Sequence, residues 1–369
     1  MARSSEWMRQ VDRSLLAAVA QILSLSNRKR RPPLAPHGVG IIQPTAIGDT
    51  LIASGAVAAI AARYPQAQIF VFHGCNNAPA VRMIDAPLEP VLCDFSRPHR
   101  ALGILRAARL DLVVDLTPWP HLTAILARLS APCAVGFAPA NSMRGKLFDV
   151  AVSHRGDRHE LDNLASMARV FGAIEDYRMQ IRVKDCDAAS ELQLDRLVVC
   201  QLSAGGSRAA EKAWPMEYWA ALCSRLIAAG FIPAFTGVAS DQKAVDVLLS
   251  QLGPSAAATI SLCGKVPLAE LGDLLRRARA VVSVDTSVLH LAGAVDARVI
   301  GLHGPTRSAR WGARCARAKG LDSPHPDAGY ITYGTETHPR AMEIMRALTP
   351  DLVVPAICET ERPAAYAQQ

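Results

Sequence analysis

Aromatic residues, closely spaced cysteines and long apolar runs are all scarce in this sequence. Phe, Trp and Tyr make up 5% of the chain, so we expect cores built from Ala, Leu, Val and Ile. None of the nine cysteines has another at C-x-x-C spacing, so neither a zinc knuckle nor a thioredoxin-like motif is indicated, and we interpret them as reduced thiols. No uncharged apolar run reaches the length of about 18 residues that a transmembrane helix needs.

The composition is nevertheless that of a folded protein. Hydrophobic residues make up 50% and charged residues 20% of the 369 positions, and this length favours two domains. A secretory signal is not predicted, because the basic cluster near the N-terminus follows the apolar stretch instead of preceding it. We therefore expect a cytoplasmic protein.

Positive charge is concentrated at the N-terminus. Residues 1–35 carry a net charge of +5 out of the total of +7, so the rest of the chain is nearly neutral. This distribution argues against a nucleic-acid partner and indicates a basic tail on a near-neutral enzyme. Apolar residues at three- and four-residue steps predict a helix over 5–25, which the basic cluster 28–31 follows. This helix either packs on protein or lies on an anionic membrane surface, to which the basic cluster adds attraction.

Strand-like and helix-like segments alternate through the rest of the chain. The alternation begins at Gly38, pauses in a polar stretch near 180–196 and restarts with an apolar strand. Such alternation is typical of parallel sheets covered on both faces, and two such series predict two facing Rossmann-like α/β domains with a ligand cleft between them. The predicted segments are a basic amphipathic extension (1–35), an N-terminal domain (36–190), a C-terminal domain (191–335) and a terminal helix with a tail (336–369).

The first candidate site is the loop Ile47, Gly48, Asp49 and Thr50. Working residues of open parallel sheets lie just past the carboxyl ends of strands, and this loop follows the first predicted strand. Gly48 lets another group approach the backbone closely. Asp49 is either the N-cap of the next helix or a general base that accepts a proton from an acceptor hydroxyl.

The second and third candidate sites follow later strands. Residues 203–215 combine glycines with Ser207 and Lys212 and could cradle a phosphate, although they match neither a Walker A motif nor G-x-G-x-x-G; a solvated surface lysine is the alternative. Asp285 then precedes a short helix, whose free N-terminal amides would favour an anion. A helix cap is the alternative for Asp285, and a structural histidine is the alternative for His290.

These residues resemble glycosyltransferase family 9, the bacterial ADP-heptose:lipopolysaccharide heptosyltransferases. The similarity runs in order from about Gly38 to about Arg346, and residues 1–35 lie outside it. It rests on Ile47-Gly48-Asp49, His159-Glu160-Leu161-Asp162, Lys212-x-Trp214-Pro215, Asp285-Thr286-x-x-x-His290-x-Ala292 and Leu302-x-Gly304-Pro305-Thr306.

The resemblance implies a GT-B fold and an inverting transfer of heptose from ADP-heptose to a lipopolysaccharide core hydroxyl. It implies that Asp49 is the catalytic base, with Ile47, Gly48 and Thr50 on the acceptor side, and that Asp285 faces the sugar. It implies a donor site in which Ser207 and Lys212 hold the diphosphate, Thr286, Ser287, Val288 and His290 border the phosphates, Asp241 lies near the ribose and Val266 beside the adenine.

Two departures from the family pattern bear on the donor. Ser287 stands where the family usually has glycine, and Arg208 stands where a small hydroxyl residue is common. The alternatives are therefore a GT-B transferase that uses another nucleotide sugar or a capsule or protein acceptor, and a non-catalytic nucleotide-sugar-binding protein. A nicotinamide dehydrogenase is disfavoured because neither domain opens with G-x-G-x-x-G.

The chemistry requires a base for the acceptor hydroxyl and positive charge or amides for the departing diphosphate. No metal-ligand cluster is visible in the sequence, so no cofactor is expected to be obligatory, although Mg²⁺ is compatible with the reaction. The expected partners are the nucleotide-sugar donor, the lipopolysaccharide core or lipid A acceptor and, through residues 1–35, the anionic cytoplasmic face of the inner membrane.

Overall fold

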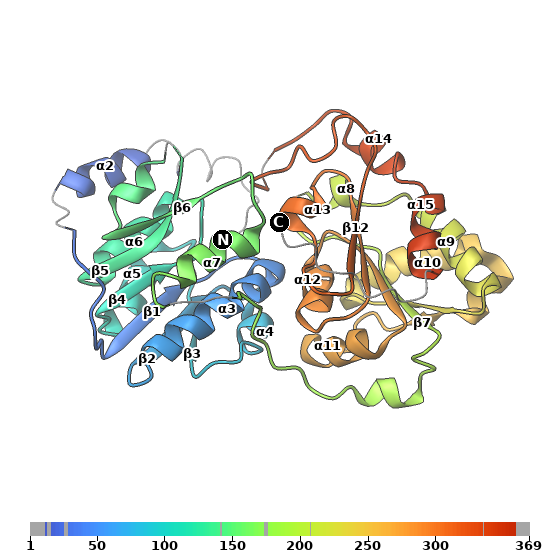
Figure 1. Cartoon of the computed structure of the whole chain (residues 1–369), viewed down its shortest axis with the longest axis horizontal. Helices are drawn as coiled ribbons and strands as arrows, with labels where there is room; N and C mark the ends of the chain where they lie inside the picture. The colour runs from blue at the N-terminus through green and yellow to red at the C-terminus, as the bar shows by residue number, and fades with distance from the viewer. Residues whose placement is uncertain are drawn as a thin grey trace. The chain divides into compact units, whose positions relative to one another are not determined.

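The structure, a computed structural model, describes residues 12, 16–25, 29–140, 142–172, 176–206, 208–334 and 336–358. The chain divides into two compact units, Met1–Arg182 and Val183–Gln369 (Figure 1). The sequence placed a boundary between residues 190 and 191, whereas the units divide earlier. The reason is that the segment after Arg182 bonds to the second unit: Lys184 N–H donates to the Ala269 carbonyl and Cys186 N–H to the Asp273 carboxylate.

The first unit contains a parallel six-stranded sheet in the order β3-β2-β1-β4-β5-β6. β1 is central, and its Val39 is in register with Ile69 of β2 and with Leu112 of β4. All residues of β1 are buried, as expected for a strand covered on both faces. The strands are β1 (Gly38–Ile42), β2 (Gln68–His73), β3 (Glu89–Leu92), β4 (Leu112–Asp115), β5 (Cys133–Pro139) and β6 (Val150–His154).

Neighbouring residues of β1 belong to two different cores of the first unit. Ile41 packs with α3 and α7, whereas Ile42 packs with α5, α6 and Ala20 of α2. This separation follows from the two-residue period of a strand. The helical segments are α2 (Ala17–Leu25), α3 (Ile47–Arg63), α4 (Ala78–Val81), α5 (Pro98–Ala107), α6 (His121–Ser130), η2 (Met143–Lys146) and α7 (Glu160–Ala168).

The second unit repeats this plan with the strand order β12-β11-β10-β7-β8-β9. Its strands are all parallel, and Val282 of β10 lies between Cys200 of β7 and Ile300 of β11. The strands are β7 (Leu197–Gln201), β8 (Ile232–Phe235), β9 (Ile260–Ser261), β10 (Ala280–Val284), β11 (Val299–His303) and β12 (Ala318–Asp322).

The main core of the second unit lies between this sheet and α9, α10 and α15. Trp219 of α9, Leu248 of α10 and Val353 of α15 are buried in it with residues of β7, β10 and β11. The helical segments are η3 (Asp187–Glu191), α8 (Ala209–Lys212), α9 (Met216–Ala228), η4 (Ala239–Asp241), α10 (Gln242–Leu252), η5 (Gly253–Ala258), α11 (Leu268–Arg277), α12 (Ser287–Ala294), α13 (Ser308–Trp311), α14 (Ala341–Arg346) and α15 (Pro350–Cys358).

The predicted α/β architecture of two doubly wound parallel sheets is thus confirmed. Among the residues that the structure describes, no helix is long and apolar enough to cross a membrane.

Candidate active site

Charged side chains meet at the carboxyl edge of the second sheet. Lys212 Nζ on α8 donates to Asp285 Oδ2 at 2.7 Å, and His290 Nε2 on α12 lies 3.8 Å from Asp285 Oδ1. Asp285 follows β10 and His303 ends β11; because these strands are parallel neighbours, both residues lie at the same edge. Asp285 and His303 are both buried, so their charges interact in a medium of low dielectric constant.

The electrostatics of this group keep Asp285 ionised. Burial alone would raise the pKa of Asp285, but the charge of Lys212, helped by His303 and His290, lowers that pKa to about 2. Burial also lowers the pKa of His303 below its usual value, although Asp285 opposes this shift. At neutral pH the site therefore holds the Asp285 carboxylate paired with Lys212. The Nδ1 of the neighbouring His303 lies 3.2 Å from the Thr306 hydroxyl.

The N-cap interpretation of Asp49 is wrong. α3 begins at Ile47, with Ala46 as its N-cap, so Asp49 lies inside the first turn of the helix. The predicted loop of Ile47, Gly48 and Thr50 is therefore helical, and Thr50 donates its hydroxyl to the Ala46 carbonyl. A carboxylate in the first turn is favoured by the helix dipole, and it does not need to cap the helix.

The alternatives for Asp285 and Lys212 are wrong as well. α12 begins at Ser287 with Thr286 as its N-cap, so Asp285 precedes the cap. Lys212 is not a solvated surface side chain, because it bonds to Asp285 and is only 21% exposed. The structure therefore brings Lys212, Asp285, Thr286, Ser287 and the buried His290 together, as the candidate donor site requires.

The remaining predicted donor residues lie in other loops of the second unit. Asp241 ends η4, after β8, and its Oδ2 accepts a hydrogen bond from the Val238 N–H at 2.9 Å. Val266 lies between β9 and α11, and Val288 is buried in the first turn of α12. Ser207 lies outside the described residues. In the part of the chain that the structure describes, no group of three or more His, Cys, Asp or Glu residues could hold a metal ion.

Sequence reasoning missed His303, Glu211 and Tyr330. His303 carries a local signal, because it is a titratable residue at the end of an apolar strand beside the strand of Asp285. Glu211 precedes Lys212 and accepts a hydrogen bond from the Tyr330 hydroxyl, which belongs to a segment 119 positions away. No local pattern could have joined these two residues.

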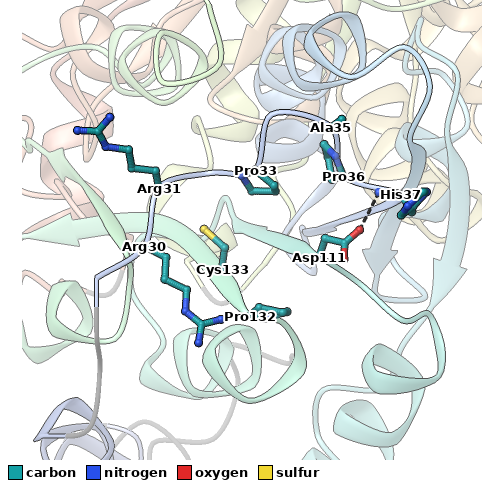
Figure 2. Close-up of a pocket in the computed structure, with 9 residues that line it drawn as sticks. All are labelled: Arg30, Arg31, Pro33, Ala35, Pro36, His37, Asp111, Pro132 and Cys133. Atoms are coloured by element: carbon teal, nitrogen blue, oxygen red, sulfur yellow. Dashed lines mark hydrogen bonds between the residues drawn. The ribbon is translucent and has the colours of Figure 1, made fainter.

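In the first unit, a cavity of about 280 Å³ lies at the amino edge of the sheet, where β1 and β5 begin (Figure 2). The His37 N–H donates to Asp111 Oδ2 at 2.7 Å at its rim. The cavity contains none of the predicted catalytic or donor residues. It is lined by Arg30, Arg31, Pro33, Ala35, Pro36, His37, Asp111, Pro132 and Cys133.

Residues 100–329, more than half of the chain, match the family described as "Glycosyltransferase family 9 (heptosyltransferase)". The chain belongs to glycosyltransferase family 9. The match covers parts of both units and includes the residues of the candidate donor site.

Relatives of this family 9 chain include a lipooligosaccharide heptosyltransferase 2 from Haemophilus influenzae. The two are 34% identical over 96 residues, which is 26% of this chain and 28% of the relative. The chain therefore aligns with about a quarter of the length of this curated relative.

Solved structures share the fold over most of the chain. E. coli ADP-heptose LPS heptosyltransferase II matches with a TM-score of 0.68 and 18% identity, covering 87% of this chain and 97% of that one. E. coli heptosyltransferase WaaC with ADP matches with a TM-score of 0.60 and 20% identity, covering 86% and 97%. These likenesses identify the fold as GT-B.

Proposed function

We propose that this family 9 protein transfers heptose from ADP-heptose to a hydroxyl of the lipopolysaccharide core, with inversion at the anomeric carbon. The observation that carries the proposal is the ion pair between the half-buried Lys212 and the buried Asp285, beside the N-terminus of α12. A lysine and free helix amides are the groups that stabilise a departing diphosphate. The structure of the neighbour WaaC was solved with ADP, which supports the nucleotide part of the donor.

In the proposed reaction the acceptor oxygen attacks the anomeric carbon of the heptose. The bond from that carbon to the β-phosphate oxygen breaks, ADP leaves, and Asp49 takes the proton of the acceptor hydroxyl. Lys212 and the amides of α12 stabilise the charge that develops on the diphosphate. Asp285, ionised at neutral pH, stabilises positive charge on the sugar ring.

The test is a turnover assay on the full chain. Purified protein is incubated with ADP-heptose, with and without a lipid A–core acceptor, and both ADP release and the anomeric configuration of the product are followed. Acceptor-dependent release of ADP with an inverted product is expected. Turnover with a different sugar nucleotide only, or binding of ADP-heptose without turnover on any acceptor, would contradict the proposal.

We also propose that the protein works at the cytoplasmic face of the inner membrane and docks there through its N-terminal segment. α2 buries Ala20 against the first unit, while Leu25 and, beyond the helix, Leu34 are 85% and 83% exposed. Between these two leucines, Arg30 and Arg31 are exposed and extend in different directions from the linker (Figure 2). Exposed apolar side chains that flank a basic cluster suit a surface of anionic lipid.

A further inference from the structure

Lys212 is carried by a short helix, α8, which lies against α14 but has little packing of its own. α8 has four residues, none of them buried. Gly206, which comes shortly before α8, has a φ of +87°, a backbone conformation that glycine adopts readily in turns. The hydrogen bond from the Lys212 N–H to the Arg208 carbonyl is long, at 3.3 Å. Beyond the contact with α14 and the buried Trp214 that follows, side-chain hydrogen bonds therefore contribute to the position of Lys212.

Glu211 receives those contacts. Arg208 Nη1 donates to Glu211 Oε1 at 2.9 Å, and the Tyr330 hydroxyl donates to Oε2 of the same carboxylate. Hydrogen bonds to an ionised acceptor are stronger than neutral ones, and the Glu211 side chain is only 19% exposed, so water screens them weakly. Glu211 is thus tied on both oxygens, one position before Lys212.

Tyr330 belongs to a segment whose own position is fixed. The Gly329 N–H donates to the Gly304 carbonyl at 2.8 Å, and the Ile331 N–H donates to the Pro305 carbonyl at 2.8 Å. These two bonds lie on either side of Tyr330, and Ile331 is buried. Burial and the neighbouring Glu211 raise the pKa of Tyr330, so its hydroxyl keeps the proton that it donates.

We propose that Tyr330 is a positioning residue: its hydrogen bond to Glu211 holds α8 so that Lys212 meets the diphosphate of the donor. The hydroxyl acts through Glu211 and Lys212 and takes no part in bond making. This inference rests on the proposed function only in assigning Lys212 to the diphosphate.

The experiment is a double-mutant cycle measured by calorimetric titration with ADP, accompanied by thermal melts. We expect Tyr330→Phe to weaken ADP binding by roughly three- to tenfold, and Lys212→Ala by about one to two decades. The double variant should bind ADP no more weakly than Lys212→Ala alone, because Tyr330 then has no lysine to position. Tyr333→Phe is the matched control, because it makes the same change on a 44% exposed tyrosine of the same segment and should leave ADP affinity unchanged.

The outcomes separate the inference from the function on which it rests. Two outcomes would overturn the positioning role and leave the proposed function intact. One is a double variant in which the two losses of ADP affinity add. The other is normal ADP affinity in Tyr330→Phe while Lys212→Ala binds ADP weakly. Normal ADP affinity in folded Lys212→Ala would overturn the donor assignment and the inference with it. A second pair reports on the same bond: Glu211→Gln keeps an oxygen that can accept from Tyr330, so it should retain more ADP affinity than Glu211→Ala.

Discussion

At the residue scale, a substitution of Asp49 distinguishes a stabilising role of its side chain from a catalytic one. Its side chain sits in the first turn of α3, where a negative charge contributes about 0.3–1 kcal/mol through the helix dipole. Asp49→Asn should therefore lower the melting temperature only slightly and leave ADP affinity near normal. If Asp49 is the base, turnover should fall by at least ~10²-fold, because the amide accepts no proton.

The control for Asp49→Asn is Asp351→Asn. Asp351 also lies in the first turn of a helix, α15, so the substitution removes a similar charge in the second unit. Because Asp351 also forms an ion pair with Arg225 of α9 at 2.6 Å, the substitution should lower stability at least as much as Asp49→Asn does, with normal turnover. The measurements are a melt, an ADP titration and a turnover rate on each protein, and normal turnover by Asp49→Asn would contradict the base mechanism.

The Lys212–Asp285 ion pair predicts how the stability of the protein depends on pH. The pKa of Asp285 in the folded protein, about 2, lies below its ordinary value of 3.8, so the stability it contributes is present above about pH 4 and is lost as the pH falls toward 2. In Lys212→Met the lysine charge that lowers this pKa is gone. The melting temperature of the natural protein should exceed that of Lys212→Met at pH 6, and the gap should narrow between pH 4 and pH 2. A gap that is independent of pH would contradict the assigned ion pair.

At the scale of elements, the N-terminal segment yields a prediction about membranes. Each basic residue near an anionic surface contributes about 1 kcal/mol, and the exposed leucines add apolar contact. The full chain should therefore sediment with vesicles that contain anionic lipid, and less so as salt is raised, whereas a protein that begins at Pro36 should stay mostly free.

Two point variants test the same surface without truncation. Leu25→Ser with Leu34→Ser should weaken sedimentation, because both side chains are exposed. Leu92→Ser is the matched control, since Leu92 is 62% exposed on β3 and has no basic cluster beside it in the sequence. Equal sedimentation of the full chain and the truncated protein would instead favour a helix that packs on protein.

The sequence predicted elements well where one physical signal dominated. The alternation of strand-like and helix-like segments predicts the two parallel sheets, because buried parallel strands such as β10 and β11 are apolar runs that need no polar face. α3 begins at Ile47, inside the segment that the sequence assigns to a loop, because no side chain caps the helix and Asp49 resembles a cap. The role of Asp285 was ambiguous because its partner, Lys212, lies 73 positions away, and pairing over that separation depends on strand order.

At the scale of the whole molecule, two similar sheets carry different side chains at their carboxyl ends. Both units are doubly wound and parallel, so the sequence pattern alone could not distinguish them. They differ in the residues at the carboxyl ends of their strands. The described Lys212, Asp285 and His290 lie in the second unit, whereas Asp49 lies in the first.

This division predicts where ADP will slow hydrogen exchange in the full chain. A ligand present at 100 times its Kd stabilises the state that binds it by about 2.7 kcal/mol, and exchange slows where opening requires ligand release. ADP alone should therefore protect the amides of α8 and the first turn of α12, and leave those of residues 47–50 unchanged. The measurement is exchange followed by mass spectrometry, with Lys212→Ala at the same ADP concentration as the control that loses most of the protection. Protection of residues 47–50 by ADP alone would mean that the first unit also binds the nucleotide, and Asp49 could then no longer be assigned to the acceptor side.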